Sequence, residues 1–99
     1  MFARVTSATV RIEMIDKFID VFQKSIIPAA KKQKGYCGAY LFVDRKTGRG
    51  NVVTLWKTEG YAIANEETMY YQEQLIKIHI LLSKNPIREG FEVAASDLI

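Results

Sequence analysis

Cysteine, histidine, tryptophan and proline are scarce in this sequence, whose 99 residues hold one Cys, one His, one Trp and two Pro. Because Cys37 is alone, the chain cannot form an internal disulfide, a zinc-binding thiolate cluster or an iron–sulfur cluster. Because His79 is alone, one chain cannot supply a two-histidine metal site. We therefore expect no bound metal ion.

Long hydrophobic runs are also missing. The longest apolar run in the C-terminal third, residues 78–82, is far shorter than the roughly 20 residues that cross a bilayer. Arg4 and Arg11 interrupt the only apolar stretch near the N-terminus, which argues against a signal peptide. Together with the lone cysteine, these features predict a cytoplasmic protein that does not contact a membrane.

The charge balance is mild, because 14 Lys and Arg against 11 Asp and Glu give a net charge of +3. Basic residues gather at 31–34 and at 45–49. The first group would end a helix, where cations meet the negative end of the helix dipole, and the second would lie in a turn. No aromatic residues are interleaved with them as in single-strand binders, so we expect solvated faces rather than a nucleic-acid site.

The sequence does contain enough apolar character for one folded domain over residues 1–99. Hydrophobic residues make up 48% and charged residues 25%, a composition that excludes a disordered chain. Period-two alternation with β-branched residues predicts strands, and the 3.6-residue period predicts helices. The expected strands are 2–12, 36–43, 51–57 and 87–95, and the expected helices are 14–33, 61–67 and 68–83.

The first expected helix has a continuous apolar stripe with a proline near its end. The stripe follows the i, i+3, i+4, i+7, i+11 spacing of one helix face, with Ile15, Phe18, Ile19, Phe22 and Ile26. Pro28 lacks an amide donor, so we expect a kink or short break there. Gly35 is expected to end the helix, because glycine adopts the left-handed backbone conformation readily.

The element order β-α-β-β-α-β predicts an α+β, ferredoxin-like domain with both helices on one face of a four-stranded antiparallel sheet. On strand 36–43 the small aliphatic side suits the helices, which makes Cys37 an expected core residue. Three rings are then expected on the open face: Tyr36, Tyr40 and Phe42. Either a second sheet covers these rings in a two-fold homodimer, which is our prediction, or a monomer tolerates their exposure.

Four segments carry a family resemblance. Residues 25–29, 35–45, 47–50 and 54–58 read SIIPA, GYCGAYLFVDR, TGRG and TLWKT. Together they resemble the antibiotic biosynthesis monooxygenase (ABM) domain over nearly the whole chain. The resemblance implies a dimeric α/β barrel of two face-to-face sheets, with a small-molecule pocket between each sheet and its helices. ABM members include cofactor-independent oxygenases of polyketide quinones and quinols, haem-degrading enzymes, and proteins with no known reaction.

The haem-degrading members carry an Asn on the first strand, then a Trp and a His on the helix after the third strand. This chain has no Asn on its first expected strand. Asn65 falls near the position of the Trp, and His79 lies about one turn beyond the matching His. We therefore do not expect haem binding or haem degradation.

A cofactor-independent oxygenase needs an apolar, water-poor pocket with a few polar groups that orient the substrate and stabilise negative charge. The candidate catalytic residues are Asn65, His79 and Arg4, and the candidate substrate-binding residues are Trp56 and Tyr71. Two of these have a structural alternative. Trp56 could be a core anchor alone, and His79 could be a packed or surface side chain.

Helix geometry and small side chains refine the expected pocket. Three small residues are expected to leave room between the sheet and the helices: Ala3, Ala39 and Ala62. Tyr70 and Tyr71 point about 100° apart on a helix, so at most one of them is expected to face the pocket. The same angle separates Glu66 from Glu67, so no paired-carboxylate site is predicted.

Two functions fit these observations. One is a cofactor-independent monooxygenase of a small aromatic or quinol substrate, in which the substrate supplies the electrons. The alternative is a non-catalytic, small-molecule-binding or stress-associated homodimer. The expected partners are a second copy of the chain and a small aromatic ligand.

Overall fold

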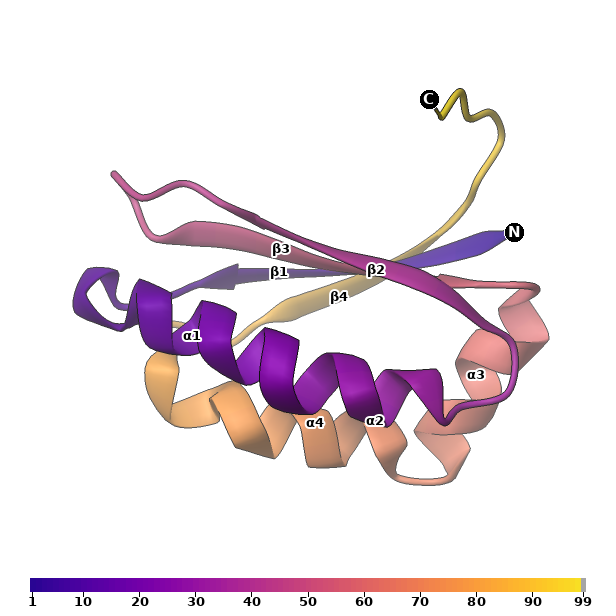
Figure 1. Cartoon of the computed structure of the whole chain (residues 1–99), viewed down its shortest axis with the longest axis horizontal. Helices are drawn as coiled ribbons and strands as arrows, with labels where there is room; N and C mark the ends of the chain where they lie inside the picture. The colour runs from indigo at the N-terminus through magenta and orange to yellow at the C-terminus, as the bar shows by residue number, and fades with distance from the viewer. Residues whose placement is uncertain (99) are drawn as a thin grey trace.

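The computed structural model describes residues 1–98. One antiparallel sheet has the strand order β2-β3-β1-β4, with β1 (Phe2–Thr9), β2 (Tyr36–Val43), β3 (Arg49–Trp56) and β4 (Ile87–Glu92). Helices α1 (Ile15–Val21), α2 (Ile27–Lys31), α3 (Glu59–Glu67) and α4 (Tyr70–Ile78) all lie on one face of this sheet (Figure 1). The predicted ferredoxin-like β-α-β-β-α-β fold is confirmed, with each helical region divided in two.

The first helical region is interrupted one turn before its proline. A π-helical turn covers Phe22–Ile26, and the amide of Ile27 donates to the carbonyl of Phe22, five residues back. Because Pro28 has no amide to donate, a widened turn at this point accommodates the proline without a sharp bend. Gly35 follows the helix with a φ of 85°, and a Cβ there would overlap the ring of Tyr61. The predicted interruption lies one turn before Pro28 rather than at the proline, and the helix ends at Lys31 rather than at residue 33. The left-handed conformation predicted for Gly35 is confirmed.

The second helical region is divided at Met69, whose φ of 67° is left-handed. Thr58 caps the start of α3 by accepting a hydrogen bond from the amide of Tyr61. The continuous helix predicted over residues 68–83 is therefore wrong in its bounds. The α-helix ends at Ile78, and a 3₁₀ turn follows at His79–Leu81.

The first and last strands in the sequence are shorter than predicted. The expected first strand ran to residue 12, but β1 ends at Thr9, and Val10 forms only an isolated bridge with Leu82. The chain leaves the sheet here because the amide of Arg11 donates to the carbonyl of Leu81 on the helical layer. The last strand ends at Glu92 rather than at residue 95.

The core lies between the sheet and the helices, where the apolar stripes meet. Phe18 and Phe22 pack in one cluster with Ile78 and Leu81, so the stripes of both helical regions face each other and the sheet. Burial of four such side chains contributes roughly 1.5–3 kcal/mol each. This packing fixes the position of α4 beneath the sheet.

A β-bulge between Tyr36 and Gly38 reverses the predicted orientation of the first residues of β2. Tyr36 lies on the helix side, where its ring meets the ring of Trp56 edge to face with centroids 5.9 Å apart. Cys37 is exposed. The placement of Tyr36 on the open face and of Cys37 in the core is therefore wrong, since one extra residue changes which side each side chain takes.

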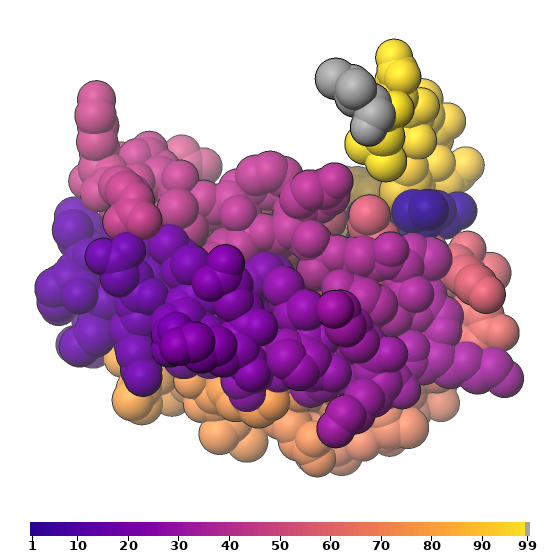
Figure 2. Space-filling view, in the orientation of Figure 1, coloured from indigo at the N-terminus to yellow at the C-terminus, as the bar shows by residue number. Residues whose placement is uncertain are grey.

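Beyond the bulge the predicted alternation holds, and the face of the sheet without helices is partly apolar. Tyr40 and Phe42 are 49% and 55% exposed and stack with ring centroids 5.7 Å apart. Ile87 and Phe91 extend the exposed apolar surface to the opposite edge of the sheet. In Figure 2 the β2–β3 hairpin and the C-terminal segment project at the two ends of this face.

Candidate functional site

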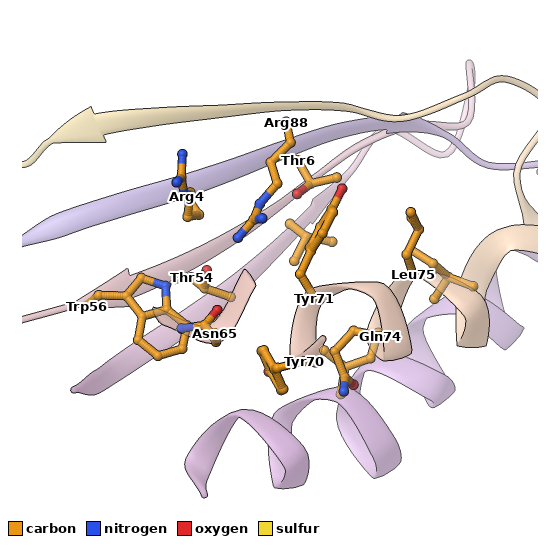
Figure 3. Close-up of a pocket in the computed structure, with 13 residues that line it drawn as sticks. Arg4, Thr6, Thr54, Trp56, Asn65, Tyr70, Tyr71, Gln74, Leu75 and Arg88 are labelled. Carbon is orange, nitrogen blue, oxygen red and sulfur yellow. Dashed lines mark hydrogen bonds between the residues drawn. The ribbon is translucent and has the colours of Figure 1, made fainter. Parts of the chain in front are cut away.

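A cavity of about 60 Å³ lies between the sheet and the helices (Figure 3). Its lining is mostly apolar and aromatic, with a few polar groups. The residues that line it are Arg4, Thr6, Ile26, Val52, Thr54, Trp56, Asn65, Tyr70, Tyr71, Gln74, Leu75, Ile78 and Arg88. Three strands and three helical segments therefore contribute to one site.

Strand alternation explains which sheet residues face the cavity. Arg4 is opposite Thr54 in the β1–β3 register, and Thr6 is opposite Arg88 in the β1–β4 register. Directly paired residues in an antiparallel sheet share a face, so these four side chains all point toward the helices. Two guanidinium groups thus project into the helix-facing layer from neighbouring strands.

Aromatic rings form much of the cavity wall. Trp56 is 1% exposed, and its indole Nε1–H donates to Thr54 Oγ1 over 3.0 Å. Tyr71 points toward Arg88, whereas Tyr70 lies farther from it (Figure 3). Burial raises the pKa of Tyr70 to about 12, so its phenol stays neutral at physiological pH.

Asn65 places an unpaired acceptor at the cavity. The residue is 4% exposed, and its Nδ2 donates to the carbonyl of Tyr61 over 2.7 Å. Because that carbonyl can only accept, the amide orientation is fixed and Oδ1 is the other atom. Oδ1 is buried and has no hydrogen-bond partner. A buried acceptor without a partner is costly, so a ligand with a hydroxyl donor would satisfy it.

Two arginines share one carboxylate at the edge of the cavity. Arg4 Nη2 and Arg88 Nη1 each lie 2.7 Å from Oε1 of Glu66 on α3. The arginine side chains are 17% and 15% exposed, against 34% for Glu66. Desolvation lowers the pKa of Arg88, the nearby Glu66 charge opposes this, and the Arg4 charge adds to the lowering.

Four of the five candidate residues line this cavity: Arg4, Trp56, Asn65 and Tyr71. His79 does not. It is exposed in the 3₁₀ turn after α4 and borders a separate open hollow with Arg11 and Lys84. The expected contact between His79 and the pocket is corrected, because the helix ends at Ile78 and the chain turns before the imidazole could face inward.

Two other expectations about the pocket also change. Tyr70 and Tyr71 both line the cavity, because they occupy the first turn of α4 and border different parts of it. None of the three alanines lines it. Ala3 pairs with Leu55 and Phe91 on the open face, while Ala62 is fully buried.

Sequence reasoning missed Arg88 and the role of Glu66. Arg88 carries a signal that could have identified it, since it alternates with Ile87 and Glu89 on the last strand and so faces the helices. Glu66 carries no such signal, because its two partners come from distant parts of the chain.

Within residues 1–98, no three His, Cys, Asp or Glu side chains are grouped so that they could hold a metal ion. No described helix has the length and apolar character needed to cross a bilayer.

Comparisons with known proteins show the fold. No family model matches the sequence, and no curated protein matches it. A solved structure from Nitrosomonas europaea, described as a proposed antibiotic biosynthesis monooxygenase, superposes with a TM-score of 0.75 at 14% identity, covering 96% of this chain and 100% of that one. A structure from Deinococcus radiodurans with the same description superposes with a TM-score of 0.76 at 12% identity. It covers 100% of this chain and 98% of that one.

A third solved structure, also from Nitrosomonas europaea, is of a protein of unknown function. It gives a TM-score of 0.76 at 18% identity and covers 99% of this chain and 93% of that one. The likeness spans the full length in each case.

Proposed function

We propose that this chain, which has the fold of the ABM structures, is a cofactor-independent oxygenase of a small aromatic or quinol substrate. The observation that carries the proposal is the buried, unpaired Oδ1 of Asn65 in an aromatic-walled cavity. Apolar sites with a few convergent polar groups are the usual form of small-molecule sites. Similar solved structures from two organisms are described as proposed monooxygenases, which supports the same reaction class.

The proposed reaction needs only the substrate and dioxygen. A hydroquinone that gains one oxygen atom becomes a hydroxyquinone, and the second oxygen atom leaves as water. The substrate supplies all four electrons that dioxygen accepts. An electron-rich, deprotonated substrate transfers electrons to dioxygen far more readily than a neutral one, so stabilising that anion is the protein's main task.

The cavity residues take distinct roles in this proposal. Trp56 and Tyr71 hold the substrate ring, and Asn65 Oδ1 accepts a hydrogen bond from one substrate hydroxyl. The guanidinium groups of Arg4 and Arg88 stabilise negative charge on the substrate. Their position beside a low-dielectric cavity strengthens this effect relative to water.

The size of the cavity limits the substrate. Its volume of about 60 Å³ is less than the roughly 150 Å³ of an engineered cavity that holds benzene. A single ring therefore enters only when a wall moves. The start of α4 is the expected moving part, because Tyr70 and Tyr71 follow the left-handed Met69.

The second candidate is a non-catalytic binding protein, and one observation favours it. No group that lines the cavity in residues 1–98 is a ready proton acceptor at neutral pH. Arginine stays protonated, and Tyr70 has a pKa of about 12. The substrate would have to lose its proton to water, helped only by the arginine charges.

We also propose that the chain forms a homodimer through the open face of the sheet. Tyr40, Phe42, Ile87 and Phe91 would otherwise leave large apolar groups in water. A two-fold contact pairs this face with itself and removes it from solvent. The cavity lies on the opposite side of the sheet, so each copy would keep its own site.

Oxygen uptake separates the two candidate functions. The protein is incubated with methylhydroquinone in air, and oxygen consumption is compared with a heat-denatured sample and with Asn65→Leu. The proposal predicts uptake above both controls and one oxygen atom from ¹⁸O₂ in the product. Binding without uptake would favour the non-catalytic alternative.

A further inference from the structure

The two cavity arginines have far fewer acceptors than they need. Each guanidinium carries five N–H donors, yet both bind the same oxygen of Glu66. Arg4 Nε is buried and has no hydrogen-bond partner. The hydrogen-bonding capacity of the two cavity-lining arginines is therefore incompletely satisfied.

The charges of the cluster are unbalanced as well. Two guanidinium charges face one carboxylate, which leaves a single positive charge beside an apolar, aromatic wall. Within residues 1–98, Glu66 is the only carboxylate that acts on Arg88, and it is not among the residues that line the cavity. A buried charge without a partner is costly, so one negative charge supplied from the cavity side would stabilise the site.

We propose that the cavity selects a small aromatic acid, whose carboxylate binds Arg4 and Arg88 and whose ring hydroxyl donates to Asn65 Oδ1. This inference rests on the proposed function in one respect, the use of the same cavity, and it names the substrate class. The substrate is then a dihydroxybenzoate, a hydroquinone that carries a carboxylate and can still supply all four electrons, rather than an uncharged hydroquinone. The simpler 4-hydroxybenzoate serves as its binding probe. Arg88 stacks on the Tyr71 ring at 3.7 Å, which restricts the guanidinium that would bind the carboxylate.

A carboxylate fits this cluster better than other anions. Its two coplanar oxygens match the donor fork of a guanidinium, and its single negative charge neutralises the cluster. A phosphate dianion would leave an excess negative charge next to apolar walls. An uncharged amide of the same shape offers one acceptor and no charge, which makes it the natural comparison.

Glu66 is then a competitor for the same two arginines. Its Oε1 contacts both guanidinium groups, which are the groups that a ligand carboxylate would bind. Removing its charge raises the positive charge available to a ligand carboxylate. If Glu66 had only a structural role, its loss would loosen the site and weaken the binding of every ligand, charged or uncharged.

The test compares 4-hydroxybenzoate with 4-hydroxybenzamide by isothermal titration calorimetry at pH 7. We expect the acid to bind at least about tenfold more tightly than the amide, because hydrogen bonds to charged groups are the stronger ones. Benzoate, which lacks the hydroxyl, should bind about three- to tenfold more weakly than 4-hydroxybenzoate. Asn65→Leu should remove that difference.

Charge variants test the assignment to the arginine pair. Arg88→Gln should reduce the preference for acid over amide to below about threefold, while Glu66→Gln should increase affinity for the acid and leave the amide within about twofold. Arg45→Gln is the matched control, because Arg45 forms an exposed ion pair with Asp16 on another part of the surface. It should preserve the native preference.

Equal affinities for acid and amide in the native protein would overturn the proposal, and so would weaker acid binding by Glu66→Gln. The first comparison needs no variant and so does not depend on whether a variant folds. Oxygen uptake with an uncharged hydroquinone is measured separately. A failed acid preference with intact uptake rejects this inference alone, whereas an intact preference without uptake rejects the oxygenase.

Discussion

The guanidinium carbon of Arg88 lies 3.7 Å from the centroid of the Tyr71 ring. The contact joins the edge strand β4 to the first turn of α4, and both residues line the cavity. A desolvated arginine on an aromatic face is worth up to about 2 kcal/mol. One contact thus fixes both a candidate ligand-binding charge and the helix that encloses the cavity.

Removal of that ring should loosen the start of α4. Tyr71→Leu is expected to lower the free energy of unfolding by about 1 kcal/mol more than Tyr71→Phe, because phenylalanine keeps the aromatic face. Urea unfolding of the two variants, followed by circular dichroism, measures the difference. Equal losses would mean that the ring contributes only its apolar area.

Trp56 is expected to act both as a core residue and as a wall of the site. Trp56→Ala should lower the free energy of unfolding by about 3–5 kcal/mol, because the side chain is fully buried. The milder Trp56→Phe should stay folded and dimeric, yet bind 4-hydroxybenzamide several-fold more weakly. Unchanged affinity in folded Trp56→Phe would leave Trp56 as a core anchor alone.

Tyr70 should make stability fall at alkaline pH. Burial raises its pKa to about 12 in the folded chain, whereas the unfolded chain ionises near pH 10. The free energy of unfolding is therefore independent of this group below about pH 10 and decreases as the pH rises from about 10 to 12. Tyr70→Phe should flatten that decrease, as measured by urea midpoints at pH 9, 10 and 11. An identical slope in the variant would contradict the assignment.

The open sheet face should control the oligomeric state. Light scattering of the native protein is expected to give twice the chain mass of 11.3 kDa. Tyr40→Glu should give the monomer mass or an unfolded chain, because a carboxylate would be buried between two sheets. The control is Ile76→Glu on α4, which is already 74% exposed and should leave the mass unchanged. A native mass of one chain would reject the dimer.

The order of strands and helices could be predicted from periodicity, because the apolar faces are long and regular. Ile15, Phe18 and Phe22 follow the helical period, and all three are buried as that period requires. Alternation on β2 likewise placed Tyr40 and Phe42 on the open face. Burial of one face determines these patterns, so the sequence records them directly.

Local irregularities could not be predicted, because they change the period rather than follow it. The bulge before Gly38 exchanges the sides of Tyr36 and Cys37, and strict alternation contains no sign of it. The left-handed Met69 ends α3 and restarts the helix, which brings Tyr70 to the cavity together with Tyr71. Met69 is not a glycine, so the sequence gives no warning of its left-handed backbone. The bulge lies beside Gly38, and a glycine within a strand often marks a bulge but does not say which side chains change sides.

The polar part of the site depends on tertiary contacts. Arg4 was a candidate from its place on the first strand, but its pairing with Glu66 and Arg88 joins three elements that are distant in sequence. Only the sheet register and the position of α3 bring them together. Candidate residues could thus be chosen from the faces of the predicted strands. The excess of positive charge that Arg4, Arg88 and Glu66 form together could be recognised only in the structure.

The most direct test of the account is whether an aromatic ligand enters the cavity beneath the sheet. Trp56 is the only tryptophan, so its indole N–H gives one assignable signal in a ¹H–¹⁵N spectrum. During an anaerobic titration with methylhydroquinone, we expect saturable shifts of that signal and of the Asn65 side-chain amide, with the backbone amides of Tyr40 and Phe42 unchanged. Shifts confined to Tyr40 and Phe42, or no shift at Trp56 at saturating ligand, would contradict the assignment of the cavity as the functional site.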